Sequence, residues 1–68
     1  MALKWQDAND IGYELFEAHE DVDPLSIDFQ TLHRWITELD DFDDDRKASN
    51  EGALEAIQMA WLEEFRAE

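Results

Sequence analysis

The residues best suited to chemistry form one acidic run near the middle of the chain. It holds six acids and no base within eight residues, Glu38-Leu39-Asp40-Asp41-Phe42-Asp43-Asp44-Asp45. Like charges this close repel one another, and a bound cation or a cluster of Arg and Lys side chains would relieve the repulsion. Carboxylates are hard oxygen ligands, which suit Ca²⁺, Mg²⁺, Mn²⁺ or Fe²⁺ better than copper or zinc. The run therefore predicts a site for a metal ion or for a basic protein surface.

One metal-binding template can be compared with this spacing. Asp41, Asp43 and Asp45 fit positions 1, 3 and 5 of an EF-hand loop. Arg46 then stands where the turn needs Gly, and Gly52 stands where a bidentate Glu is needed. An EF-hand is therefore excluded, and we expect an open loop that binds metal weakly and with little selectivity. The alternative is a solvated loop that only keeps the protein soluble.

Three side chains near helix ends or loops have two possible roles each. Phe42 is expected to anchor the acidic run to the core, although it could instead contact a partner. His33 is expected to be partly buried and hydrogen-bonded rather than a metal ligand, and His19 to cap a helix or face solvent.

The sequence has no Gly-rich phosphate loop, Cys nucleophile or Ser-His-Asp arrangement, so an enzyme is not predicted.

The whole chain is strongly acidic. Nineteen acids against five bases give a net charge of −14, and there is no Cys. Nucleic acid is held mainly by Lys and Arg, so binding of DNA, RNA or an anionic membrane is not expected. The lack of Cys excludes disulfides, thiolate zinc sites and iron–sulfur clusters held by thiolates of this chain. With no secretory segment and no apolar run long enough to span a bilayer, we expect a cytoplasmic protein.

Three helices are predicted to position these residues in a single domain, residues 1–68. They are expected at about residues 7–19, 30–40 and 50–65. Asp7 is the expected N-cap of the first helix, and Ser49 or Asn50 that of the third. Apolar stripes on the three helices predict one core, formed by Ile11, Leu15, Leu32, Trp35, Ile36, Leu39, Leu54, Ile57 and Trp61.

Two further patterns lie outside these stripes. A second stripe of carboxylates on the first helix is interpreted as a solvated face; it consists of Asp10, Glu14, Glu17 and Asp21. Residues 25–29 alternate between apolar and polar types, which predicts at most a very short extended segment. The Asp23-Pro24 pair separates this segment from the first helix, because the residue before Pro disfavours helical geometry.

Short motifs along nearly the whole chain together resemble one family. They are Leu3-Lys4-Trp5, Asp23-Pro24, His33-x-Trp35-Ile36, Asp41-Phe42-Asp43-Asp44-Asp45, Ala48-Ser49-Asn50-Glu51, Leu54-Glu55-Ala56-Ile57 and Trp61-Leu62. These motifs resemble the IscX family, the small acidic proteins of bacterial iron–sulfur cluster assembly operons. The most specific part is the aspartate run together with the Ala-Ser-Asn-Glu that follows it.

The resemblance implies a mainly α, compact three-helix domain of modified winged-helix type. It also implies binding of Fe²⁺ and of the cysteine desulfurase IscS, at a surface also used by frataxin, to regulate cluster assembly. The expected metal ligands are Glu38, Asp40, Asp41, Asp43, Asp44 and Asp45. The expected partner-binding residues are Asp41, Phe42, Asp43, Asp44, Asp45 and Glu51. Arg46-Lys47 depart from the family pattern and could fold back on the acids, which would weaken metal binding.

A second class of function stays open. A metal-independent acidic protein could occupy a basic protein surface, either as a mimic of nucleic acid or as an inhibitor. A winged-helix transcription factor is disfavoured, because the net charge of −14 opposes DNA binding.

Overall fold

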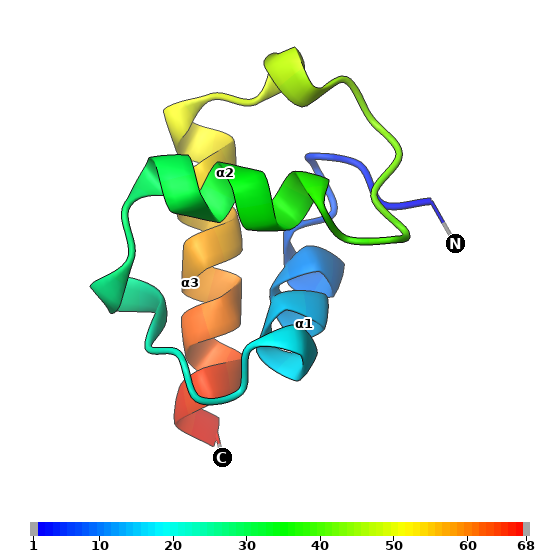
Figure 1. Cartoon of the computed structure of the whole chain (residues 1–68). Helices are drawn as coiled ribbons and strands as arrows, with labels where there is room; N and C mark the ends of the chain where they lie inside the picture. The colour runs from blue at the N-terminus through cyan, green and yellow to red at the C-terminus, as the bar shows by residue number, and fades with distance from the viewer. Residues whose placement is uncertain (1, 68) are drawn as a thin grey trace.

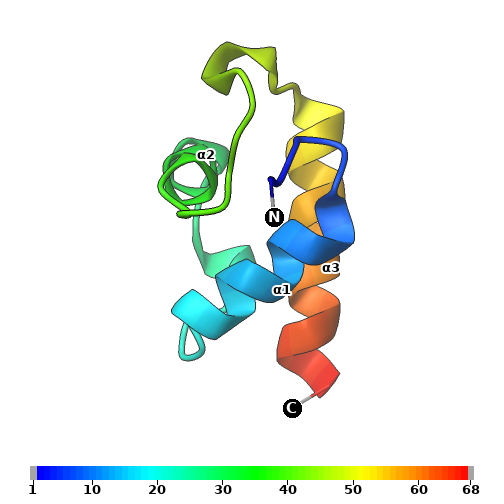
Figure 2. The ribbon, with the colours of Figure 1, turned by 90° about the vertical axis from the view of Figure 1, so that its right-hand side faces the viewer.

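Helices α1 (Ala8–Ala18) and α3 (Glu51–Ala67) cross as a close pair in the computed structural model, which describes residues 2–67 (Figures 1 and 2). Ile11 and Leu15 of α1 and Trp61 of α3 are fully buried. A Cβ added at Gly12 would lie 2.7 Å from the backbone nitrogen of Trp61 and 2.8 Å from the Cβ of Ala60. The lack of a side chain at Gly12 therefore allows the two helices to approach this closely.

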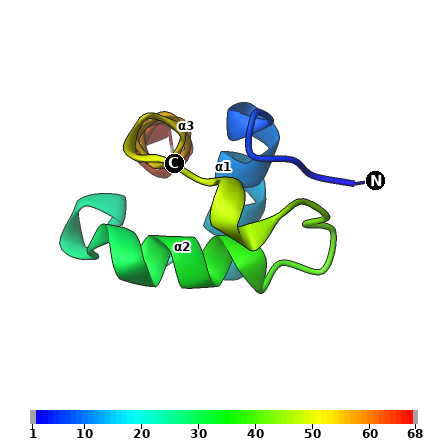
Figure 3. The same cartoon turned by 90° about the horizontal axis from the view of Figure 1, so that it is seen from above.

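Helix α2 (Phe29–Thr37) lies across the α1–α3 pair (Figures 1 and 3). Its N-cap is Asp28, whose carboxylate accepts a hydrogen bond from the Thr31 N–H at 2.8 Å. Leu32 and Ile36 are fully buried beneath it. The predicted end of this helix at Asp40 was too late, because Glu38 is already the C-cap and the chain then turns.

The extended part of residues 25–29, predicted to be at most very short, covers only two residues. Pro24–Ser26 form a short 3₁₀ helix, η1, in which the Asp23 carboxylate accepts from the Leu25 N–H at 2.9 Å. Only Ile27 and Asp28 are extended, before Phe29 opens α2. A side-chain cap closed over a Pro at the first position stabilises a turn locally, and this outweighed the alternation of residue types.

The two predicted N-caps have different outcomes. Asn50 caps α3, since its Oδ1 accepts from the Ala53 N–H at 2.8 Å. Asp7 stands at the N-cap position of α1, but its carboxylate accepts from the Lys4 N–H at 2.9 Å and makes no cap bond to the helix. The Asp7 side chain therefore fixes the segment that enters α1.

The prediction of one core under three helices is confirmed. Seven of the nine predicted residues are buried, and Trp35 and Leu39 pack partly buried against them. Leu3 and Trp5 also belong to this core, at 4% and 6% exposed, and the helical periodicity did not include them. Between residues 2 and 67 there is no sheet, and the single isolated β-bridge pairs Leu3 with Phe42 in parallel. No helix in this range combines the length and the apolar character needed to cross a bilayer.

Candidate functional site

The acidic loop (residues 38–45) lies beside the N-terminal segment (residues 3–5), as Figure 1 shows. The Leu3 N–H donates to the Asp41 carbonyl at 2.7 Å, and the Asp43 N–H donates to the Leu3 carbonyl at 2.9 Å. These two bonds form the parallel bridge between Leu3 and Phe42. The path of the loop backbone is therefore set by residues from the far end of the sequence.

Trp5 makes the largest set of contacts with the loop. Its indole Nε1–H donates to the Asp45 carbonyl at 2.6 Å. Its ring stacks on His33 with centroids 5.3 Å apart and meets the Phe42 ring edge-on at 4.8 Å. Phe42 is partly buried against the core. The prediction that Phe42 anchors the loop is confirmed, with Trp5 as its main aromatic neighbour.

Two carboxylates of the loop accept hydrogen bonds from backbone N–H groups. Asp44 accepts from the Trp5 N–H through one oxygen at 3.1 Å and from the Asp45 N–H through the other at 2.7 Å. These two N–H groups, Trp5 first, hold the pKa of the Asp44 carboxyl below its ordinary value. Asp45 accepts from the Lys47 N–H at 2.9 Å and so caps the short 3₁₀ helix η2 (Arg46–Ala48).

The other carboxylates of the loop face outward. Those of Glu38, Asp40 and Asp41 accept no hydrogen bond from any residue between 2 and 67. The Asp43 side chain is 80% exposed, and its carboxylate lies 4.0 Å from Lys4 Nζ, the single ion pair among the described residues. Arg46 and Lys47 thus form no ion pair with the aspartates, and the fold-back that the sequence left open for these two cations is not observed among the described residues.

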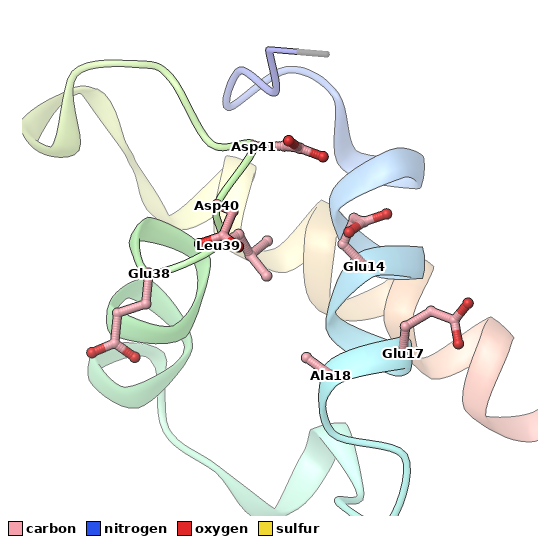
Figure 4. A pocket seen from close by; sticks show the side chains of 7 residues that line it. All are labelled: Glu14, Glu17, Ala18, Glu38, Leu39, Asp40 and Asp41. Carbon is pink, nitrogen blue, oxygen red and sulfur yellow. The ribbon is translucent and has the colours of Figure 1, made fainter.

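An open hollow of about 490 Å³ separates the start of the acidic loop from α1 (Figure 4). Its lining, which we call the acidic hollow, consists of Glu14, Glu17, Ala18, Glu38, Leu39, Asp40 and Asp41. Figure 4 shows Asp41 directed from the loop toward α1 and Glu38 directed away from it. Five acidic residues from two separate parts of the chain therefore line the hollow, although the Glu38 carboxylate is turned away from α1.

Comparison with known proteins bears on what this face serves. Residues 3–66 match the family model described as iron-sulphur cluster assembly. The chain belongs to this iron–sulphur cluster assembly family. It is also 48% identical over 64 residues to an uncharacterized protein of Pseudomonas aeruginosa, PA3808, with 94% of this chain and 97% of that protein aligned. The predicted resemblance is thus confirmed over nearly the whole chain, and with it a role in iron–sulphur cluster assembly.

The residues predicted as metal ligands in this family member are not gathered into one coordination sphere. Between residues 2 and 67, no three His, Cys, Asp or Glu side chains are grouped closely enough to hold a metal ion. The six predicted ligands instead divide into two sets. Asp44 and Asp45 bind backbone N–H groups, whereas the outward set comprises Glu38, Asp40, Asp41 and Asp43.

The stripe on α1 is the part of the face that sequence reasoning missed. Glu14 and Glu17 were interpreted as a solvated face, and they line the acidic hollow opposite the loop. The signal was present, since the stripe was recognised, but nothing local indicated what it would face. Glu51, predicted to bind a partner, is exposed at the first position of α3.

Both histidines have structural contacts. His33 Nε2 lies 2.7 Å from the Arg46 carbonyl, and His33 is partly buried. His19 is the C-cap of α1, and its ring stacks on Trp35 with centroids 4.0 Å apart and planes 11° apart. The expectation of a hydrogen-bonded His33 and a capping His19 is confirmed.

Proposed function

We propose that this protein is an iron-binding adaptor that regulates cluster assembly by docking its acidic face on the cysteine desulfurase IscS. The acidic face consists of the acidic hollow and the acidic loop. The observation that carries the proposal is that acidic residues of α1 and of the loop line one hollow, and that Lys4 with Asp43 is the single ion pair among residues 2–67. Membership of the family indicates the process, which is iron–sulphur cluster assembly. The resemblance to the IscX family implies the partner, IscS, and a desulfurase surface that frataxin also uses.

The expected interface is electrostatic. Exposed charge pairs contribute only about 0–1 kcal/mol each, so several carboxylates must act together. A net charge of −14 attracts a basic surface over distances of about 10 Å at 0.1 M salt, and about 3 Å at 1 M. Such a field acts mainly on the rate of association. Phe42 and Trp5 are mostly occupied by contacts within the chain, so the charged side chains are the better candidates for the first encounter.

Ferrous iron is proposed to bind the same face weakly. The donors available are hard carboxylate oxygens, which fit Fe²⁺, and the chain offers no thiolate. Asp40 and Asp41 lie across the hollow from Glu14 and have no competing hydrogen bond among residues 2–67. Because the carboxylates are exposed and must move together to share an ion, we expect low affinity and little selectivity.

Desulfurase binding can be tested with two charge-matched double variants. Asp40→Asn with Asp41→Asn removes two charges from the acidic face, and Glu55→Gln with Glu63→Gln removes two exposed charges from α3 outside the hollow. Calorimetry with purified cysteine desulfurase should show weaker binding for the first pair than for the second, and weaker binding of the wild type as salt rises from about 0.1 M to about 1 M. Equal loss in both pairs, or binding indifferent to salt, would contradict docking through this face.

The role of iron needs its own measurement. An anaerobic NMR titration with Fe²⁺ should broaden the resonances of Asp40, Asp41 and Glu14 most strongly. Broadening centred on Glu55 and Glu63 would place the metal elsewhere.

The metal-independent alternative is supported by one observation, namely the lack of a gathered ligand group among residues 2–67. It predicts that desulfurase affinity is the same with Fe²⁺ and with a chelator. A change of affinity on adding Fe²⁺ would exclude it.

A further inference from the structure

The N-terminal segment makes more contacts with the acidic loop than an entry into a helix requires. Three residues of the segment bind four of the loop. Leu3 exchanges two backbone bonds with Asp41 and Asp43, Lys4 Nζ donates to the Asp43 carbonyl, and Trp5 donates to Asp44 and Asp45.

We propose that the N-terminal segment fixes the shape of the acidic loop, with Trp5 and Asp44 as positioning residues for the docking face. Asp40, Asp41 and Asp43 then carry the charge that a basic partner contacts. The second half of this inference rests on the proposed function, whereas the first half concerns the free protein alone.

A loop of this composition needs such support. Six carboxylates in eight residues repel one another, and residues 39–45 lie outside every helix of the structure. Repulsion favours an expanded, mobile loop, and a mobile loop must be ordered when it binds. A loop already held in its bound shape avoids that cost and binds more tightly for the same contacts.

The contacts of Trp5 suit it to this task. The residue is 6% exposed, so its indole is part of the core while its Nε1–H reaches the loop carbonyl of Asp45. Stacking on His33 and the edge contact with Phe42 fix the ring orientation. Trp5 thus joins the loop to the core, alongside the core residue Leu3 and the partly buried Phe42.

Asp44 is the matching group on the loop. Each of its oxygens accepts one backbone N–H, so Asp44→Asn must lose one of the two bonds. Asp43→Asn makes the same change of charge and shape one position earlier, and the Asp43 carboxylate has only the 4.0 Å contact with Lys4. The two variants therefore separate loss of charge from loss of loop shape.

Hydrogen exchange followed by NMR tests the structural half without any partner. The amides of Leu3 and Asp43, which bond across the bridge, should exchange about tenfold faster or more in Asp44→Asn and Trp5→Phe, a larger factor than for the buried amides of α3. Asp43→Asn should leave them near the wild-type rate. Equal rates in Asp43→Asn and Asp44→Asn would overturn the inference.

Desulfurase affinity tests the second half. Both aspartate variants lose one charge, and Asp44→Asn should weaken binding at least as much as Asp43→Asn does, although the Asp44 carboxylate is bonded within the chain and is not among those that contact the partner. An affinity of Asp44→Asn close to that of the wild type would show that loop shape does not contribute to docking. If the wild type fails to bind the desulfurase at all, the proposed function is wrong, and the exchange results still decide whether the segment fixes the loop.

Discussion

Aspartates in this chain differ in what their carboxylates bind. Asp23 and Asp28 each accept a backbone N–H at the start of a helical turn, as Asp45 does in the acidic loop. Asp40 and Asp41 accept none from residues 2–67. A residue type that looks uniform in the sequence thus contributes local structure at some positions and free charge at others.

Asp28 provides a test at the scale of the residue. The Thr31 N–H and hydroxyl hold the pKa of Asp28 below its ordinary value of about 3.9. A lowered pKa in the folded state means that the stabilisation is complete above that ordinary value and is lost as the pH falls through the folded-state pKa. Asp28→Ala should therefore lower the free energy of unfolding at neutral pH, and the difference from wild type should narrow below about pH 4.

Urea unfolding at several pH values measures this difference. Asp28→Asn is the control, because Asn is an equally good N-cap without the charge. A difference between Asp28→Ala and wild type that does not change with pH would mean that the cap does not depend on ionisation.

At the scale of the element, the crossing of α1 and α3 determines where the acidic stripe lies. The contact at Gly12 determines how closely α1 approaches α3. Glu14 and Glu17 lie within the next turn and a half of α1. Gly12→Ala would place a Cβ 2.7 Å from backbone, which cannot move aside easily. We expect a loss of about 1–3 kcal/mol in the free energy of unfolding, despite the better helix propensity of Ala.

The second glycine is the matched control. Gly52 is exposed near the start of α3, and a Cβ there would meet only the capping oxygen Asn50 Oδ1, at 3.3 Å, which needs to shift by only a few tenths of an ångström. Gly52→Ala should therefore change the thermal midpoint much less than Gly12→Ala does. Similar losses in both variants would show that the close approach at Gly12 is not what restricts that position.

At the scale of the whole molecule, burial of one small core must outweigh the repulsion that a large net charge causes in the folded chain. Trp61 is fully buried at its centre, and its Nε1 is buried without a hydrogen-bond partner among residues 2–67. Trp61→Ala should cost about 3–5 kcal/mol, because the cavity is large. Trp61→Phe should cost less, since it also removes an unpaired buried N–H, which itself costs about 1–3 kcal/mol. Denaturant unfolding would measure both, and an unchanged midpoint for Trp61→Ala would contradict the central place of this residue.

The charge itself predicts opposite effects of salt on folding and on docking. Self-repulsion of a chain with net charge −14 weakens as salt screens it, so the Tm should rise between about 0.1 M and about 1 M sodium chloride. Over the same range the affinity for a basic partner should fall. Scanning calorimetry measures the Tm, and a binding titration measures the affinity. A Tm that falls as salt rises would show that attractive ion pairs dominate over repulsion.

Local patterns in the sequence were sufficient for the helices and most of the core. Stripes such as Leu54, Ile57 and Trp61 repeat with the helix period, and the Asn50 cap acts within one turn. The acidic run and the membership of the family could also be recognised from the sequence. These features could be predicted because each depends on residues only a few positions apart.

Only the tertiary structure decided how the acidic loop is held and what it faces. Trp5 and Asp44 are 39 positions apart, and no periodicity links an N-terminal tryptophan to a distant aspartate. Glu14 and Asp41 likewise come to line one hollow because α1 packs in the direction that buries Ile11 and Leu15. Burial of the apolar stripes supplies the free energy, and the polar side chains on the adjoining faces are brought together as a consequence.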